Sequence, residues 1–332
     1  MTSPKATFAI PCRNGAPFLR ALLESLLAQT CQDFALVLVD DASTDDSAAV
    51  ARQVCGERIT IVRNDAPLGL IPNFNRCAEL VRTPFFCLSH ADDVYEPQYL
   101  ERLLGALEAA PAAGFAHCRA GAIDEHGRPY DAPAERFKGR FWAALPGPSA
   151  AAHFRLLYAG NYIVCPTVLF RTAAYRSAGG FRADLRYAAD WELWLRMVAR
   201  GLLPVAVDAP LFRYRRHDDS ATRAAARVLV RYREEIEILQ WARDEAGRSG
   251  FGNGWPPSFA LRNSLLQDAG DDLLAGLRDE AATKLAFLRD HAPATYAHPT
   301  VRVFRLLARL GRPGTWLLRA ARRAALHFAR VP

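Results

Sequence analysis

The chain has 332 residues, of which 51% are hydrophobic, enough to bury the core of one large domain or two medium-sized ones. This composition excludes a disordered tail protein and a small disulfide-stapled scaffold. The seven cysteines are scattered and form no CxxC pair, which argues against a zinc knuckle. No apolar run approaches the roughly 18 residues that span a bilayer, and the first residues lack a signal-peptide core, so we expect a cytoplasmic protein.

The net charge of +7 comes from the C-terminal end of the chain. Residues 301–332 contain eight arginines and no lysine, aspartate or glutamate, whereas the first 300 residues carry 34 basic and 35 acidic side chains. Because the main part of the chain is balanced, the net charge does not indicate a nucleic-acid partner, and we expect none.

The first half of the chain alternates between strand-like and helix-like patterns. Short apolar runs at 7–11, 34–39, 59–62 and 84–88 predict strands, and apolar residues at helical spacing follow each run. Such alternation is typical of an α/β fold, in which helices cover a mostly parallel sheet.

The second half begins with a predicted strand near 114–119. The segment 124–148 is rich in proline, glycine and charged residues, and we predict a loop there. A further strand is expected at 167–171 and a helix at about 190–200.

Beyond residue 217 the pattern predicts helices only, so we place a domain boundary near residue 220. Residues 1–220 would form the α/β domain, and residues 221–332 a helical region with a basic amphipathic end. In that end, Arg302, Arg305 and Arg309 share one helical face with apolar residues around them. The segment 301–332 can lie on an anionic membrane surface, or it can pack on the first domain as an ordinary helical hairpin.

Acidic residues follow three of the predicted elements where ligands of α/β sheets usually bind, beyond the carboxyl ends of the strands. These residues are the pairs Asp40-Asp41 and Asp92-Asp93, and Asp190 at a helix start. Neighbouring carboxylates repel each other unless a cation is present, and hard oxygen ligands favour Mg²⁺ or Mn²⁺. A divalent ion held in this way usually also binds phosphate oxygens, which points to a diphosphate substrate.

The segment after the first strand reads Pro-Cys-Arg-Asn-Gly over residues 11–15 and contains no glycine-rich phosphate loop. Both a Walker-type nucleotidase and a Rossmann dehydrogenase would need such a loop at this place. Both classes are therefore excluded.

Five motifs occur in an order that resembles a known family. They read AIPCRN at 9–14, VDDASTD at 39–45, ADD at 91–93, GGF at 179–181 leading to ADW at 189–191, and YRRH at 214–217. Together they resemble the family 2 inverting glycosyltransferases, of the non-processive bacterial type, over about residues 5–220. The resemblance implies a GT-A-like fold: a mostly parallel sheet sandwiched by helices, here followed by a helical C-terminal region.

The resemblance also implies a site for a nucleotide-sugar donor. Pro11, with Cys12 and Asn14 beside it, would border the nucleotide base, and Asp41 would hydrogen-bond the base. Asp92 would face the ribose.

A divalent metal, Mn²⁺ or Mg²⁺, and a catalytic base complete the site that the resemblance implies. Asp93 and His217 match positions that contact the metal, and Asp190 matches the base. His90 stands where many family members have the first aspartate of the metal motif, and no QxxRW sequence typical of processive synthases is present.

Elementary chemistry agrees with these roles. Inversion at a sugar carbon requires the acceptor hydroxyl to attack opposite the departing nucleoside diphosphate, with a base near the hydroxyl and positive charge near the leaving group. A carboxyl group with an ordinary pKa of about 3.9 is ionised at pH 7, so Asp190 can accept a proton.

We therefore expect an enzyme that transfers one sugar from a nucleotide sugar to a hydroxyl of a saccharide or lipid-linked saccharide. A setting in bacterial surface polysaccharide or glycolipid synthesis would suit a basic end that reaches the inner face of the membrane. The alternatives are a nucleotidyltransferase, a non-catalytic nucleotide- or sugar-binding module, and a nucleic-acid-binding protein that uses the arginine-rich end.

Overall fold

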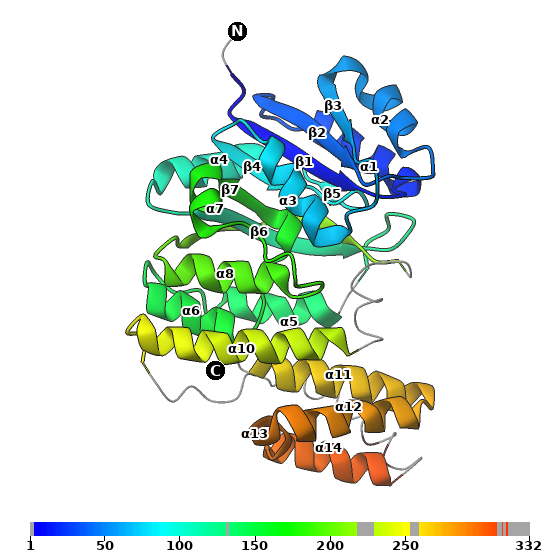
Figure 1. The fold of residues 1–332 in the computed structure, drawn as a ribbon, viewed down its shortest axis with the longest axis vertical. Helices are drawn as coiled ribbons and strands as arrows, with labels where there is room; N and C mark the ends of the chain where they lie inside the picture. The colour runs from blue at the N-terminus through cyan, green and yellow to red at the C-terminus, as the bar shows by residue number, and fades with distance from the viewer. Residues whose placement is uncertain are drawn as a thin grey trace.

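The computed structural model describes residues 3–130, 133–217, 229–252 and 259–310, together with residues 314 and 317. A sheet with helices on both faces forms its upper part in Figure 1, and a stack of helices forms its lower part. The strands are β1 (Ala6–Cys12), β2 (Phe34–Asp40), β3 (Ile59–Arg63), β4 (Phe85–Leu88), β5 (Val94–Tyr95), β6 (Phe115–Ile123), β7 (Val168–Arg171) and β8 (Pro204–Arg215). The helices are α1 (Ala16–Leu27), α2 (Ser47–Cys55), α3 (Leu70–Leu80), α4 (Tyr99–Ala109), α5 (Pro133–Trp142), α6 (Ala150–Ala159), α7 (Thr172–Ala178), α8 (Ala189–Ala199), α10 (Val230–Arg248), α11 (Phe259–Ala275), α12 (Arg278–His291), α13 (Pro293–Tyr296) and α14 (Pro299–Arg309).

The eight strands form one sheet in the order β3-β2-β1-β4-β7-β6-β8-β5. Strand β1 is parallel to β2 and β4, β2 is parallel to β3, and β6 is parallel to β8. Strand β7 runs antiparallel to β4 and β6, and β5 runs antiparallel to β8. The predicted, mostly parallel α/β sheet is confirmed, and the antiparallel strands make it a mixed sheet.

The sheet is buried on both faces, as the apolar strand runs require. Along β1, Phe8 and Ile10 face a core shared with α1 and α4, whereas Ala9 faces a core shared with α3, α7 and α8. Side chains alternate in this way because successive residues of a strand point to opposite faces. The carboxyl ends of β1, β2 and β4 therefore stand at one fixed edge of a sheet that packing holds on both sides.

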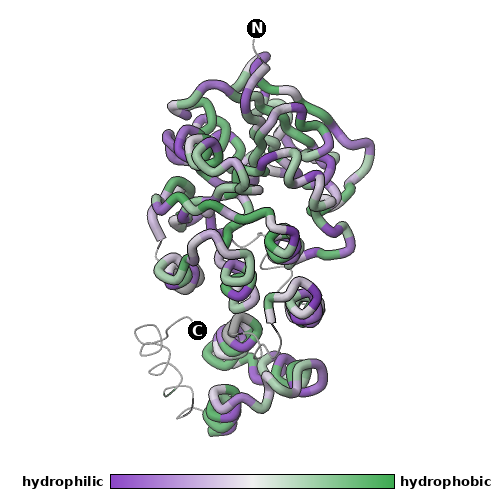
Figure 2. The backbone as a smooth tube through the Cα atoms, turned by 90° about the vertical axis from the view of Figure 1, so that its left-hand side faces the viewer, coloured by the Kyte–Doolittle hydropathy of each residue, from purple (hydrophilic) through white to green (hydrophobic). Residues whose placement is uncertain are grey.

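The C-terminal helices extend the core that the sheet shares with α3, α7 and α8. Tyr232 and Ile238 of α10 belong to the same apolar cluster as Trp191 and Trp194 of α8. Both tryptophans are buried, and Trp191 donates its indole N–H to the carbonyl of Leu157 at 2.8 Å. The lower helices carry hydrophobic and hydrophilic residues on different sides of their turns (Figure 2), as expected for helices that cover one another.

The sequence prediction was wrong or incomplete in several places, and it missed strand β5 and helices α6 and α7. The segment 124–148, predicted as a loop, contains helix α5. Strand β8 was not predicted at all, although it pairs with β6 from Pro204 to Arg215. The pairing is irregular around Arg119, where the register shifts.

The predicted boundary near residue 220 falls in 218–228, outside the described residues, and most of 311–332 is also outside them. Within α14, Val301 and Phe304 are buried, whereas Val303, Leu306 and the following Leu310 are 56%, 60% and 56% exposed. In the part of the chain that the structure describes, no helix is both long and apolar enough to span a bilayer.

Candidate functional site

The site lies where β1, β2 and β4 end. Because these strands are parallel neighbours, the residues that follow them, including Asp41, Asp92 and Asp93, gather at one edge of the sheet. Asp190 lies in the first turn of α8. The edge of the sheet thus gathers Asp41, Asp92 and Asp93, whereas the Asp40 carboxylate pairs with Arg63.

Asp41 holds the loop at 64–69 against the end of β2. Its side chain is buried and accepts hydrogen bonds from the backbone N–H groups of Leu68 at 2.7 Å and Gly69 at 3.0 Å, and from the Asn64 amide at 2.9 Å. The Arg13 guanidinium lies 3.9 Å from the same carboxylate. The predicted contact of Asp41 with a nucleotide base therefore has to use the oxygen lone pairs that these partners leave free.

The segment after β1 is joined to the segment after β2. Asn14, with a φ of 51°, donates its backbone N–H to the Ser43 hydroxyl at 2.9 Å, and its side-chain oxygen accepts the Thr44 N–H at 2.8 Å. Cys12 and Pro11 are buried, and burial raises the pKa of the Cys12 thiol to about 11. These three predicted nucleotide contacts shape one rigid turn, and their direct contact with a nucleotide remains a prediction.

Three side chains form a cluster with the geometry of a metal site. The ligand atoms of His90, Asp92 and Asp93 all lie within 4.8 Å of one another. His217, predicted to approach the metal, has its Nε2 atom 2.9 Å from Asp92 Oδ2. His217 thus reaches the cluster through Asp92, and the structure adds His90 to the set of candidate ligands.

The cluster fits a divalent cation because it contains buried polar atoms without partners. Asp93 Oδ1 accepts the Arg215 backbone N–H at 2.8 Å, whereas no described residue hydrogen-bonds Asp93 Oδ2 or His90 Nε2. Burial and the charge of Asp92 raise the pKa of Asp93 well above its usual value. Burial lowers the pKa of His90, which favours the neutral imidazole that binds metals. A bound cation would offset the cost of the two unpaired buried atoms, because it would bind them directly. It would also offset the cost of burying the carboxylate charge.

Asp190 is held by one carboxylate oxygen. Its Oδ1 accepts the Trp191 backbone N–H at 2.7 Å and the Asn161 amide at 3.2 Å, whereas no hydrogen bond from a described residue reaches Oδ2. Burial raises the pKa of Asp190, and the positive charge of Lys138 opposes this effect. The arrangement fixes the carboxyl group and leaves one oxygen able to accept a proton.

The metal cluster and Asp190 act on a common neighbour. Burial raises the pKa of the Cys165 thiol well above its ordinary value, and the charges of Asp190 and Asp93 raise it further. Asp93 and Asp190, from distant parts of the sequence, are therefore both within electrostatic range of the Cys165 thiol.

One residue that positions this site was not predicted from the sequence. Glu234 of α10 accepts the backbone N–H groups of Arg186, Tyr187 and Ala188 at 2.8, 2.8 and 2.9 Å. These residues form the turn before α8, so the buried carboxylate fixes the start of the helix that carries Asp190. No sequence signal marked Glu234, because it stands in a charged helical stretch that resembles a solvent-facing surface.

The sequence matches a family model and named relatives. Residues 7–175, half of the chain, match the model described as glycosyl transferase family 2. The chain is 32% identical over 246 residues to an uncharacterized protein of Mycobacterium tuberculosis (strain CDC 1551), covering 72% of this chain and 75% of that protein. It is 30% identical over 203 residues to the PGL/p-HBAD biosynthesis glycosyltransferase of Mycobacterium bovis (strain BCG), covering 59% of this chain and 70% of that enzyme.

Two solved structures share the fold. TarS 1–349 of S. aureus, in complex with UDP-GlcNAc, aligns with a TM-score of 0.56 and 13% identity over 98% of this chain and 93% of TarS. The mannosyltransferase PcManGT of Pyrobaculum calidifontis, in complex with GDP-Man and Mn²⁺, aligns with a TM-score of 0.56 and 17% identity over 98% and 82% of the two chains. The motifs, the mixed sheet and the matched family model agree, and the chain belongs to glycosyl transferase family 2, as a glycosyltransferase with the GT-A fold.

Proposed function

We propose that the protein is a metal-dependent, inverting glycosyltransferase that moves one sugar from a nucleotide sugar to a hydroxyl group. The observation that carries this proposal is the pairing of a cation-binding cluster, formed by His90, Asp92 and Asp93, with the free carboxylate oxygen of Asp190. An inverting transfer requires these two features, positive charge at the leaving group and a base at the acceptor.

The donor would bind at the edge formed by β1, β2 and β4. Both structural neighbours were solved with a nucleotide sugar, UDP-GlcNAc in one and GDP-Man in the other. The turn at 11–14 and Asp41 would border the base, and Asp92 would face the ribose. The hydrogen bonds among these segments keep the base site rigid before the donor arrives, which lowers the entropy cost of binding.

The metal would be held by Asp93 and His90, with Asp92 and His217 beside them. When bound, a divalent cation supplies positive charge to the diphosphate leaving group. The neighbour PcManGT was solved with Mn²⁺, and the carboxylate donors of the cluster suit Mn²⁺ as well as Mg²⁺.

The base would be Asp190, whose Oδ2 takes the proton from the acceptor hydroxyl. Asn161 and the Trp191 N–H hold Oδ1, so the free oxygen keeps a defined direction toward the acceptor. The acceptor would be a saccharide or lipid-linked saccharide in surface polysaccharide or glycolipid synthesis. Family membership argues against the alternatives considered from the sequence, a nucleotidyltransferase and a non-catalytic or nucleic-acid-binding protein.

A screen of nucleotide sugars tests this proposal. Thermal unfolding of the full chain would be followed with each nucleotide sugar in Mn²⁺ and again in excess EDTA. We expect at least one nucleotide sugar to raise the unfolding temperature in Mn²⁺ and to lose most of this effect in EDTA. Equal stabilisation in EDTA would show that donor binding does not need the metal. No stabilisation by any nucleotide sugar would contradict the proposed function.

Replacing Glu234 with alanine should impair both stability and activity. Three backbone N–H groups would lose their acceptor, so we expect the free energy of unfolding to fall by about 1–3 kcal/mol. Because the start of α8 would loosen, donor hydrolysis should slow while the donor KM stays the same. Denaturant unfolding and steady-state kinetics measure both effects.

Glu237 provides the matched control for this variant. It lies on the same helix, but its side chain is 54% exposed and pairs with Arg182 at 2.7 Å. Glu237→Ala should change the free energy of unfolding and the rate of donor hydrolysis little, because exposed ion pairs contribute little to stability. Equal effects of the two substitutions would show that Glu234 has no special role in positioning Asp190.

We also propose that the C-terminal end is peripheral to the inner face of the cell membrane. In α14 and directly after it, the exposed apolar residues Val303, Leu306 and Leu310 stand beside the exposed Arg302 and Arg309. Near an anionic surface each arginine contributes on the order of 1 kcal/mol of binding. The buried residues of α14 pack as the hairpin interpretation expects, so the proposal rests on the exposed face alone.

Replacing Val303, Leu306 and Leu310 together with serine should reduce co-sedimentation with anionic liposomes several-fold at low salt. Because these side chains are more than half exposed, stability should change by only about 0.5 kcal/mol per site. Leu277→Ser, which alters a side chain that is 47% exposed elsewhere in the helical region, is the control. Unchanged liposome binding in the triple variant would contradict the membrane contact.

A further inference from the structure

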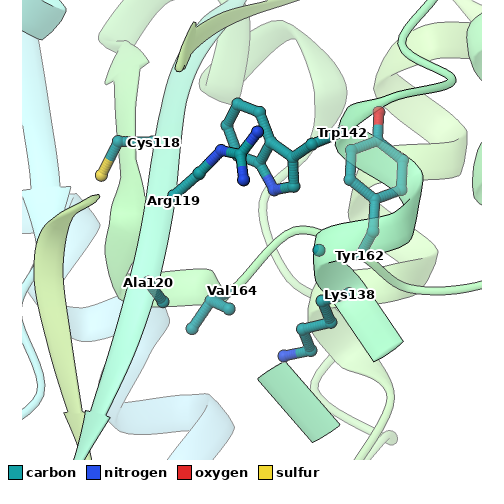
Figure 3. A pocket seen from close by; sticks show the side chains of 8 residues that line it. Cys118, Arg119, Ala120, Lys138, Trp142, Tyr162 and Val164 are labelled. Atoms are coloured by element: carbon teal, nitrogen blue, oxygen red, sulfur yellow. The ribbon is translucent and has the colours of Figure 1, made fainter. Parts of the chain in front are cut away.

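A small hollow opens between β6, α5 and the segment at 162–164 (Figure 3). Its walls include Arg119 of β6, Lys138 and Trp142 of α5, and Tyr162. The volume of the hollow is about 90 Å³. A cavity needs only about 10–15 Å³ of such space to hold one water molecule, so the hollow has room for a small group of several atoms.

The wall of the hollow is positively charged. Arg119 and Lys138 both line it, and none of its lining residues is acidic. Arg119 uses its Nε atom to pair with Asp208, and its guanidinium lies over the Trp142 ring at 5.1 Å. The position of Arg119 is therefore fixed, and no described residue accepts a hydrogen bond from its terminal nitrogens.

Lys138 differs from the other two lysines of the chain. Lys5 pairs with Glu108 at 3.1 Å, and Lys284 pairs with Asp272 at 2.5 Å. Among the described residues, no carboxylate oxygen lies within 4.0 Å of the Lys138 ammonium. A half-buried ammonium that lines the same hollow as a second cation, with no described carboxylate at ion-pair distance, is an environment that an anionic ligand stabilises.

The hollow adjoins the proposed catalytic base. Tyr162 follows directly after Asn161, which donates its amide to Asp190 Oδ1 at 3.2 Å. The charge of Lys138 acts on the Asp190 carboxyl group, so the ammonium stands within electrostatic range of the base. The hollow therefore lies on the side of the site where the acceptor hydroxyl has to be, and the metal cluster marks the donor side.

We propose that this hollow binds an anionic group of the acceptor, a phosphate or a carboxylate, through Lys138 and Arg119. The inference rests on the proposed function in one respect, that Asp190 marks the acceptor side. The size of the hollow admits such a group, and the sugar ring that carries the reacting hydroxyl would lie outside it, toward Asp190. The substrate class that follows is an acceptor with a phosphate or an acidic sugar next to the hydroxyl that is glycosylated.

Titration calorimetry with simple probes tests the inference on the full chain. Glucose 6-phosphate, glucuronate and glucose would each be titrated into the protein saturated with Mn²⁺ and UDP or GDP, so that the diphosphate site is already filled. We expect a charged probe to bind at least ten times more tightly than glucose. Preference for the phosphate or for the carboxylate identifies which acidic acceptor the site takes.

The same titrations on variants locate the binding. Lys138→Gln should lower the affinity for the charged probe at least tenfold, because a charge-assisted hydrogen bond is lost. Lys138→Arg should retain most of that affinity. Lys5→Gln is the control, because it removes a lysine far from the site. Thermal unfolding of each variant checks that the fold is intact, and Arg119→Gln provides a second variant of the same wall.

The outcomes separate this inference from the proposed function. Equal binding of glucose and the charged probes, no binding of any probe, or unchanged affinity in both Lys138→Gln and Arg119→Gln would overturn the inference. Nucleotide binding in Mn²⁺ is measured independently before each titration, and its absence would contradict the proposed function instead. A loss of nucleotide affinity in Lys138→Gln would assign Lys138 to the donor side and would also overturn the inference.

Discussion

Asp190→Asn is expected to slow sugar transfer by about 10² to 10⁴-fold, the typical cost of losing a general base. The amide cannot accept the acceptor proton, but it can still accept the hydrogen bonds of Asn161 and the Trp191 N–H at Oδ1. Donor affinity in Mn²⁺ should therefore stay the same. Steady-state kinetics with the donor, together with titration of the nucleotide, separates these two effects.

The pH dependence of the same variant distinguishes a base from a structural residue. Burial raises the pKa of Asp190, so the wild-type rate should fall as the pH drops through this raised value, because protonation removes the base. The residual activity of Asp190→Asn should not show this fall at low pH. Near-normal turnover of the variant, or an unchanged loss of activity at acid pH, would mean that Asp190 has only a structural role in the first turn of α8.

Asp93→Asn is expected to weaken metal-supported donor binding by more than about 100-fold. Residues that only orient a metal ligand typically affect metal affinity or activity by about 10- to 100-fold, and we expect the loss of a direct ligand to exceed this. Asp93 Oδ2 is buried and accepts no hydrogen bond from a described residue, with His90 Nδ1 3.9 Å away, so a cation would supply the partner that it lacks. Asp92→Asn should have a smaller effect, because Asp92 Oδ2 is already engaged by His217 at 2.9 Å. Titration of Mn²⁺ against each variant measures the difference.

Stability without metal provides the control for Asp93→Asn. The asparagine oxygen can still accept the Arg215 N–H, and the substitution removes a buried negative charge next to Asp92. We therefore expect the metal-free variant to be at least as stable as the metal-free wild type. A variant that unfolds far more easily and yet binds Mn²⁺ normally would show that Asp93 has a structural role.

The strands that carry the site could be predicted almost to the residue. Strand β2, for example, was predicted at 34–39 and observed at Phe34–Asp40, because a strand buried on both faces leaves a continuous apolar run in the sequence. Strand β8 leaves no such run, since Pro204, Asp208 and Pro210 interrupt it and its pairing with β6 is irregular. Helix α5 was missed because it begins with a proline, contains a glycine and carries four charged residues among its ten, a composition that is typical of a loop.

Residues of the site likewise differ in how far the sequence could predict them. Asp92, Asp93 and Asp190 stand in local motifs, so the sequence alone was enough to single them out. Glu234 and Lys138 stand in no motif, and their relation to Asp190 arises only in the folded chain, where α10 packs beside α8 and α5 packs on β6. Such residues could not be found from spacing, because tertiary contacts between distant segments define their partners.

The initial anomer formed during donor hydrolysis tests the central claim most directly. The full chain would be incubated with the nucleotide sugar that binds it and with Mn²⁺, and the released sugar would be followed by proton NMR before mutarotation. The account predicts that the first sugar released has the anomeric configuration opposite to that of the donor, and that Asp190→Asn releases it far more slowly. Release with retained configuration, or at an equal rate in Asp190→Asn, would contradict the proposed inverting mechanism with Asp190 as the base.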